Sequence, residues 1–261
     1  MNNDRMQRQR FELKYLVDEP TAMGIRNYVG ALLDLDEAGQ GKPNHSYRVN
    51  SLYLDSEGLS TFWHWVNADR NRFKLRLRFY DSNPNTPVFL EIKQRLGNCI
   101  LKQRCGVHKR AVPMILNGLF LPDELMVSRD AKDIAALGHF IRMTAQLRAR
   151  PQALVTYLRE AYIDPENPGV RVTMDRDVRI APRHTAEFSL DLDRSEQPFG
   201  DRVILELKFT NRFPNWFADL VRLFGLTRSA AAKYCEGVAS LWHPELGNCA
   251  PRAQAANRAF A

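Results

Sequence analysis

Cations at every second position are the chemically informative feature of this sequence of 261 residues. Residues 73–79, with the sequence FKLRLRF, carry Lys74, Arg76 and Arg78 between apolar residues. Successive side chains of a β-strand point to opposite faces, so these three cations would share one face of a strand. A guanidinium matches phosphate oxygens with its planar fork, and an ammonium adds a compact positive charge. The segment therefore predicts a strand that presents cations to a phosphate-bearing ligand.

Six further segments show the same alternation of charged or polar residues with apolar ones. Their shared faces carry Glu12 and Lys14, Glu91 and Lys93, Lys102 and Arg104, Tyr157 and Arg159, Arg171 with Thr173 and Asp175, and Glu206 and Lys208. For a single strand, a sheet with one dry face and one solvated face explains such a pattern. Over seven segments, the excess of Arg and Lys favours a common site, because neighbouring rows of cations repel one another unless an anion lies between them.

The glutamates among these cations indicate a metal as well as an anion. Mg²⁺ usually binds one or two carboxylates together with phosphate oxygens. Phosphoryl transfer depends on positioning and charge neutralisation more than on a protein nucleophile, so a site of Lys, Arg and Glu is sufficient for it. The sequence offers no competing motif, since it has no Gly-rich phosphate loop and its cysteines lack zinc-site spacing. These cysteines are Cys99, Cys105, Cys235 and Cys249.

A sheet is needed to position these side chains, and the hydrophobic pattern predicts about eight or nine strands and about four or five helices. Strands are expected at 10–17, 47–54, 72–80, 88–95, 100–107, 153–162, 170–180, 188–192 and 203–209. Helices are expected at 18–35, with Asp18 as N-cap, and at 56–66, 128–148, 214–224 and 229–241.

Hairpin-like connections between the predicted strands favour antiparallel pairing. Closing such a sheet would turn its charged faces inward and leave its apolar faces outward against the helices. The expected fold class is therefore α+β, with a closed antiparallel β-barrel of about eight strands, a charged lumen and flanking helices.

Composition and charge limit the class of protein. The chain carries 37 Lys and Arg against 30 Asp and Glu, a formal charge of +7, so an anionic partner is expected. No apolar run approaches the roughly 18 residues of a membrane-spanning helix, and no secretory signal is visible. A cytoplasmic location is therefore expected. We expect a single domain over residues 8–243, with flexible tails at 1–7 and 244–261.

Several of these segments, taken in order, resemble a known family. They are FELKY at 11–15, SLYLD at 51–55, FKLRLRFY at 73–80, FLEIK at 89–93, YLREAY at 157–162, VRVTMDRD at 170–177, ILELKF at 204–209 and AKYC at 232–235. Together they resemble the VTC domain, the polyphosphate polymerase domain of the vacuolar transporter chaperone family. That domain lies within the CYTH-like superfamily of triphosphate tunnel metalloenzymes. The resemblance covers residues 8–243 and is that of a bacterial stand-alone form.

The resemblance implies a β-barrel tunnel that binds tripolyphosphate or longer polyphosphate, with Mn²⁺ or Mg²⁺ as cofactor, and that transfers the γ-phosphate of ATP to a growing chain. It implies catalytic roles for Lys14, Arg76, Arg78, Lys93, Arg159 and Lys233. It implies metal binding for Glu206, to which the strand phase adds Glu12. Substrate binding is implied for Lys102 and Tyr157, and the strand phase adds Lys74, Glu91, Arg104 and Lys208.

Three departures from the family pattern concern the site. Arg10 replaces the first glutamate of the E-x-E-x-K that opens the wider superfamily, which favours a polymerase over a two-metal hydrolase. Ala232 stands where a serine commonly precedes the last lysine, and Ser229, one helical turn earlier, is a candidate replacement for substrate binding. Trp65 stands in place of an arginine of the eukaryotic enzymes.

The same residues are compatible with other functions. A tripolyphosphatase, a nucleoside triphosphatase or a non-catalytic polyphosphate-binding subunit would use the same tunnel. A membrane-protein partner and the oligomeric state are open as well. Nucleic acid is not expected, because its binding favours cations and aromatic residues on exposed loops rather than on strands.

Two smaller groups of residues have alternative explanations. The aromatic residues Phe62, Trp63 and Trp65 are able to stack a base, but packing of a short helix explains them better. Asp191 and Asp193 alternate on a late predicted strand, where we expect them to be solvated rather than to join Glu206 at a metal.

Overall fold

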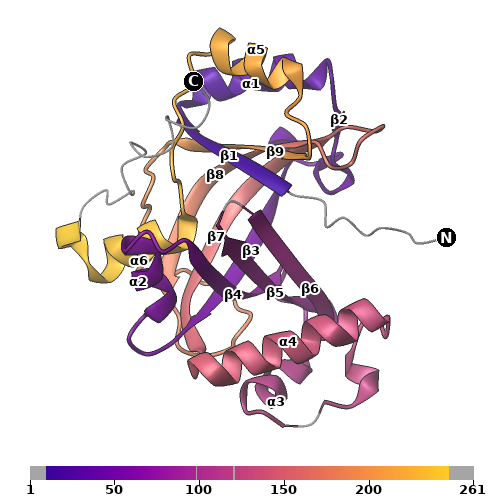
Figure 1. Ribbon diagram of the computed structural model, residues 1–261, viewed down its shortest axis with the longest axis vertical. Coiled ribbons are helices and arrows are strands. Elements are labelled where there is room, and N and C mark those ends of the chain that lie inside the picture. The colour runs from indigo at the N-terminus through magenta and orange to yellow at the C-terminus, as the bar shows by residue number, and fades with distance from the viewer. Residues whose placement is uncertain (1–9, 98, 120, 247–261) are drawn as a thin grey trace.

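The computed structural model describes residues 10–246 except 98 and 120 (Figure 1). Within these residues the chain forms nine strands and six α-helices. The strands are β1 (Arg10–Val17), β2 (Asp34–Leu35), β3 (Ser46–Asp55), β4 (Asn71–Phe79), β5 (Pro87–Leu96), β6 (Cys99–His108), β7 (Arg150–Ile163), β8 (Arg171–Pro182) and β9 (Val203–Thr210). The helices are α1 (Glu19–Gly30), α2 (Ser60–Val66), α3 (Val112–Leu116), α4 (Ala131–Leu147), α5 (Asn215–Leu223) and α6 (Lys233–Trp242). The tail expected at 1–7, and the tail expected at 244–261 from residue 247 onward, lie outside the described residues.

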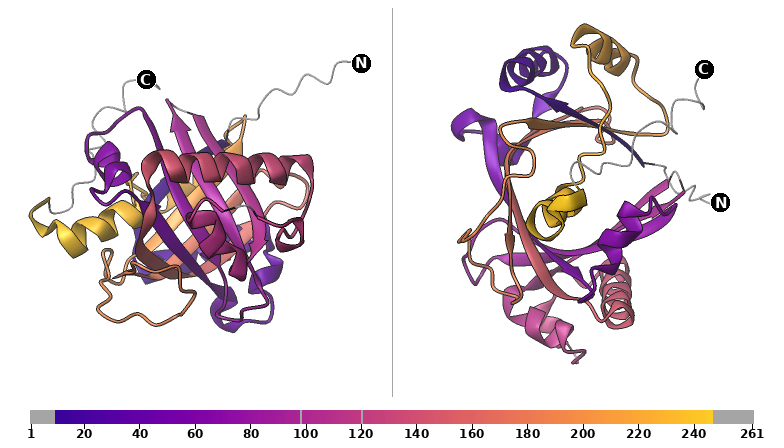
Figure 2. Two further views of the ribbon diagram at one scale, coloured as in Figure 1. Left: turned by 90° about the horizontal axis from the view of Figure 1, so that it is seen from below. Right: turned by 90° about the vertical axis from the view of Figure 1, so that its left-hand side faces the viewer.

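The strands form one antiparallel sheet that curls round on itself (Figure 2). Their order is β2-β7-β3-β4-β5-β6-β1-β9-β8, and β8 pairs with β7 as well. That last pairing is long, from Ala153↔Pro182 to Ile163↔Arg171. By contrast, β1 and β6 meet at the single pair Arg10↔Ile100. The α+β class and the antiparallel sheet are as expected from the sequence.

The expected closure of the barrel is wrong at the seam between β1 and β6. The edge of β1 that faces this seam is bound instead by the segment that leads into α6. The backbone of Ser229 donates a hydrogen bond to the carbonyl oxygen of Lys14 at 2.8 Å, and Tyr15 forms a β-bridge with Arg228. Because these residues occupy the backbone groups that β6 would need, the sheet is joined there at one residue pair.

The apolar faces of the strands lie outward under two groups of helices, as the alternation predicts. One cluster packs outward-facing residues of β4, β5 and β6, such as Leu77 and Leu90, against Phe140 of α4. A second packs β1, β8 and β9 against Ile25 of α1 and Phe217 of α5. These layers leave the charged faces of the strands on the inside of the curled sheet, which we call the inner face. Among the helices of the described residues, none combines the length and hydrophobicity that a membrane crossing requires.

Several element boundaries differ from those expected. Residues 188–192 form no strand, and their segment is a loop that packs Phe188 on Phe79. The first helix ends at Gly30 rather than near residue 35, although Asp18 does cap it by accepting a hydrogen bond from the backbone of Thr21 at 2.9 Å. Asp191 in this loop was expected to be solvated, and it is exposed and accepts a hydrogen bond from a nearby serine.

Asp55 at the end of β3 fastens two helices to the sheet. Its buried carboxylate accepts hydrogen bonds from the backbone of Ser56 at 2.8 Å and of Thr61 at 2.9 Å at the start of α2. It also accepts one from the hydroxyl of Tyr234 on α6 at 2.9 Å. Phe62 of α2 is fully buried and stacks on a histidine at the end of α6, so the packing interpretation of the aromatic cluster is supported.

Replacing Asp55 should therefore be far more costly than removing an ordinary helix cap. In Asp55→Ala several buried donors lose their acceptor, so we expect the free energy of unfolding to fall by about 3 kcal/mol or more. The matched change Asp18→Ala, at the exposed cap of α1, should lower it by about 1 kcal/mol. Urea denaturation of both variants measures the two values. Equal losses would contradict the role assigned to Asp55.

Candidate functional site

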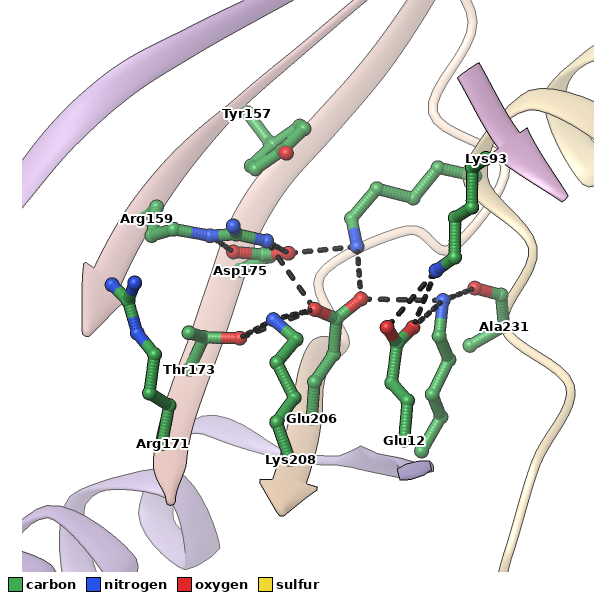
Figure 3. Close-up of polar contacts among 12 residues, drawn as sticks. Glu12, Lys93, Tyr157, Arg159, Arg171, Thr173, Asp175, Glu206, Lys208 and Ala231 are labelled. Atoms are coloured by element: carbon green, nitrogen blue, oxygen red, sulfur yellow. Dashed lines mark hydrogen bonds and ion pairs between the residues drawn. The ribbon is translucent and has the colours of Figure 1, made fainter. Parts of the chain in front are cut away.

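The inner face carries a network of ion pairs contributed by seven strands and by the first residue of α6. Figure 3 shows the part of this network around Glu206 and Glu12. Among the described residues, nine cations take part: Lys14, Arg76, Arg78, Lys93, Lys102, Arg104, Arg159, Lys208 and Lys233. Four carboxylates face them: Glu12, Glu91, Asp175 and Glu206. The network therefore has five more positive than negative charges. This excess favours binding of a polyanion.

Glu206 on β9 is the most highly connected carboxylate of the network. One oxygen lies 3.0 Å from the ammonium of Lys233 and 3.2 Å from that of Lys14. The other lies 2.6 Å from Lys208 and 3.3 Å from the guanidinium of Arg159. Burial alone would raise the pKa of Glu206, but the surrounding cations hold it well below its usual range. The carboxylate is therefore ionised at every physiological pH.

Asp175 on β8 forms ion pairs with two of the cations that also contact Glu206. Its two oxygens each lie 2.7 Å from a nitrogen of Arg159, which is a bidentate pair, and one lies 2.7 Å from Lys233. The side chain is fully buried. Our sequence analysis noted that Arg171, Thr173 and Asp175 share a strand face but assigned them no role. That shared face was the signal that could have identified Asp175.

A second group of cations surrounds Glu91 on β5, which is also fully buried. Its carboxylate accepts from Arg76 at 2.7 Å and lies 2.9 Å from the ammonium of Lys102. Arg78 and Arg104 lie farther away, each at 3.7 Å. As an anion, Glu91 repels phosphate, so any contribution to substrate binding is made through the cations that it holds.

Lys93 and Glu12 join the two groups across the seam. The ammonium of Lys93 lies 2.9 Å from the carboxylate of Glu12, which also pairs with Lys14 at 3.3 Å. Fifteen residues were predicted for the site, and the structure places thirteen of them in direct contact with this network: Glu12, Lys14, Arg76, Arg78, Glu91, Lys93, Lys102, Arg104, Tyr157, Arg159, Glu206, Lys208 and Lys233.

Tyr157 provides an aromatic surface beneath two of these cations. Its ring centroid lies 5.1 Å from the guanidinium of Arg159 and 5.0 Å from the ammonium of Lys233, both within cation–π range. Its hydroxyl accepts a hydrogen bond from Arg78 at 3.4 Å. Tyr157 therefore connects the group around Glu91 with the group around Glu206.

The remaining two predicted residues lie at the edge of the network. Lys74 has its ammonium 5.7 Å from the ring centroid of Tyr234. Ser229 contacts the backbone of Lys14 through its own N–H, and within the described residues its hydroxyl makes no hydrogen bond that would replace the serine missing at Ala232. The prediction of a substrate-binding hydroxyl at Ser229 therefore has no support beyond its position.

Tyr53 is a site residue that the sequence analysis did not assign. Its hydroxyl accepts a hydrogen bond from Arg76 at 3.1 Å, and its ring stacks on Tyr234 at 4.6 Å between centroids. Since Tyr234 in turn donates to Asp55, the guanidinium of Arg76 is connected to the cap of α2. Tyr53 lies in the SLYLD motif and on the inner face of its strand, so strand phase was the available signal.

Two carboxylates of the network are placed to hold a divalent cation. The ammonium of Lys14 lies within 3.3 Å of one oxygen of Glu12 and of one oxygen of Glu206, so the two acids share one cation and a metal that met both would displace this ammonium. Within the described residues, no group of three or more His, Cys, Asp or Glu side chains is arranged to bind a metal. The residues therefore fit a metal that arrives with phosphate oxygens as its other ligands, which is the usual arrangement for Mg²⁺.

Comparison with known proteins gives one strong match. The sequence pattern of the family described as VTC domain matches residues 9–242. No curated protein matches the sequence. Two solved structures are similar in shape, a proposed adenylate cyclase from Bacillus halodurans and the PH1819 protein from Pyrococcus horikoshii OT3.

Both structural likenesses are distant. The first has a TM-score of 0.48 and 12% identity and covers 85% of this chain and 94% of that one. The second has a TM-score of 0.42 and 13% identity and covers 87% and 93%. Likenesses of this size support no statement on function.

Crowding of the cations changes their titration. Burial, together with Arg76 and Arg78, lowers the pKa of Lys102 to about 7 although Glu91 opposes the shift. Burial also lowers the pKa of Lys208 to about 8, with Arg159 acting in the same direction. Part of the positive charge of the inner face is therefore lost when the pH rises above 7 to 8.

Binding of a phosphate chain should accordingly take up protons. At about pH 8, Lys102 is mostly neutral in the free protein, and an adjacent phosphate would raise its pKa and favour the ammonium. We expect the wild type to bind more protons with tripolyphosphate than Lys102→Met does, and its affinity to weaken more steeply above pH 7. Calorimetry in two buffers of different ionisation enthalpy measures the difference. Identical proton counts for the two proteins would contradict the prediction.

Proposed function

Because the chain belongs to the VTC domain family, we propose that it is a metal-dependent polyphosphate polymerase that transfers the γ-phosphate of ATP to a growing polyphosphate chain. The observation that carries this proposal is the excess of five positive charges, counted with every group ionised, in a partly buried ion-pair network. Within the described residues, no Ser, Cys or His side chain takes part in this network, so a covalent protein intermediate has no candidate nucleophile there.

The proposed reaction is a direct displacement. A terminal oxygen of the bound chain attacks the γ-phosphorus of ATP, the bond from that phosphorus to the β,γ-bridging oxygen breaks, and ADP leaves with the bond's electron pair. The attacking oxygen is already ionised, so no general base is required. Such transfers depend on positioning and on neutralisation of charge on the transferred group.

Different residues of the network are suited to positioning and to charge neutralisation. Arg159 and Lys233 are held rigidly by Asp175 and stand over Tyr157, so they are suited to orient the reacting phosphates. Arg76, held by Glu91 and Tyr53, supports the neighbouring phosphate. Mn²⁺ or Mg²⁺, held by Glu206 and Glu12 with phosphate oxygens, would supply further charge neutralisation when bound.

A product assay tests the proposal and separates it from the alternatives. With ATP and Mn²⁺, we expect a ladder of polyphosphate on a gel and ADP in equal amount to the phosphate units incorporated. Free phosphate without polymer would instead identify a hydrolase on the same site. Tight binding of polyphosphate with neither product would identify a non-catalytic binding subunit.

A variant of Glu206 tests the metal role separately from binding. Glu206→Gln keeps the size of the side chain but removes the charge that attracts a divalent cation, so we expect the metal-dependent rate to fall about 100-fold. The same change removes a negative charge beside four cations, so tripolyphosphate should bind without metal as tightly as in the wild type or more tightly.

The exposed acid Glu57, in the turn before α2, provides the matched control. Glu57→Gln should change neither the rate nor the binding. A Glu206→Gln protein that made polymer at the full rate would rule out the metal role.

A further inference from the structure

Three cations on the inward sides of β4 and β5 lie outside the ion-pair network just described. Arg72 and Lys74 share the face of β4 that carries Arg76 and Arg78, because these four residues occupy every second position of the strand. Arg95 shares the face of β5 that carries Lys93 in the same way. Within the described chain, no carboxylate lies within ion-pair distance of Arg72, Lys74 or Arg95. Among the described residues, none of these three cations is therefore paired directly with an acid.

The register of the sheet sets these cations against one another. Arg72 is directly opposite Arg95, and Lys74 is directly opposite Lys93. On the other side of β5, Lys93 is directly opposite Lys102. Like charges at such positions destabilise a sheet. Two successive cross-strand levels of cations therefore adjoin the Glu91 group. Among the described residues, Glu12 pairs with Lys93 and Glu91 pairs with Lys102, and the level of Arg72 and Arg95 has no ion pair with an acid.

The local contacts hold these side chains in place without neutralising them. Arg72 is half-buried and donates a hydrogen bond to the carbonyl oxygen of Asp69 at 2.6 Å. Arg95 is exposed and donates to the carbonyl oxygen of Gly97 at 3.0 Å. Carbonyl oxygens position a guanidinium but do not remove its charge, so both remain available to an anion.

The row of cations along β4 is too long for a triphosphate. Its four members, from Arg72 to Arg78, are three two-residue steps apart, which is about 20 Å along a strand. A tripolyphosphate has only two bridging oxygens and does not cover that length. The row also runs from a buried end, where Arg78 is 7% exposed, to Arg72, which is half-buried and lies directly opposite the exposed Arg95 of β5.

We propose that Arg72 and Arg95, with Lys74 behind them, form an outer subsite for the phosphates of a chain longer than tripolyphosphate. The inference rests on the proposed function in one respect, namely that the inner face binds phosphate. It adds a direction, because the buried groups around Glu206 and Asp175 hold the end of the chain while the outer subsite guides the remainder toward solvent.

A binding experiment with ligands of two lengths tests this subsite. The double variant Arg72→Gln/Arg95→Gln should bind a polyphosphate of several tens of phosphates about tenfold more weakly than the wild type, as expected for the loss of two partly exposed charge contacts. Its affinity for tripolyphosphate should change less than about twofold. Arg129→Gln/Arg142→Gln, which removes two exposed arginines near α4, is the control of equal charge and should bind both ligands as the wild type does.

Each other result overturns the subsite. Equal weakening of both ligands would indicate a general loss of charge, and so would weakening in the control. Unchanged binding of the long chain would show that it does not reach Arg72 and Arg95. Single-stranded RNA that displaces the long chain from the wild type but not from the double variant would assign these arginines to nucleic acid instead.

Two further measurements keep the interpretation unambiguous. The single variant Arg95→Gln changes only an exposed side chain and should give part of the same length-dependent loss, so that a folding defect at Arg72 is recognised. Binding is measured without turnover, and the proposed function can therefore fail independently. If the wild type makes no polymer but binds the long chain through Arg72 and Arg95, the proposal of an outer subsite stands and the proposal of a polymerase is wrong.

Discussion

Repulsion among cations on the inner face is the constraint on which the rest of the structure depends. Nine lysines and arginines are held close together in a partly buried space, which would be unfavourable without counter-charges. Four carboxylates make the arrangement stable, and two of them, Glu91 and Asp175, are fully buried. Each acid contacts at least two cations, so the network is a set of shared pairs rather than a row of separate ones.

The alternation of charged and apolar residues was sufficient to predict the sheet, the outward apolar faces and twelve of the residues that lie in the network, while Lys233, on a helix, was predicted from the family resemblance. It worked because strand phase is a local property with a period of two residues. Asp175 and Tyr53 were missed for the opposite reason. Strand phase puts both side chains on the inner face, but their partners, Arg159 with Lys233 and Arg76 with Tyr234, come from other elements, and the fold is needed to show that they meet.

The error at the seam has a similar origin. A closed barrel requires β1 to pair along its length with β6, its neighbour in the sheet. Instead, residues near Ser229, more than two hundred positions along the chain, bind that edge of β1. Competition between two distant segments for one set of backbone groups leaves no periodic pattern in either segment. Likewise, residues 188–192 have an alternating pattern but pack one aromatic side chain on the outer layer and stay a loop.

The buried acids have a second consequence besides keeping the free protein folded. Any anion that enters must compete with Glu91, Asp175 and Glu206 for guanidinium and ammonium groups that are already satisfied. The net gain on binding is therefore smaller than nine bare cations would provide, and the loss on departure is smaller by the same amount. When the anion leaves, each cation returns to a waiting carboxylate instead of standing alone. The acids thus allow a bound anion to dissociate from a densely basic surface. Such dissociation is required if the site is to bind and release anions repeatedly.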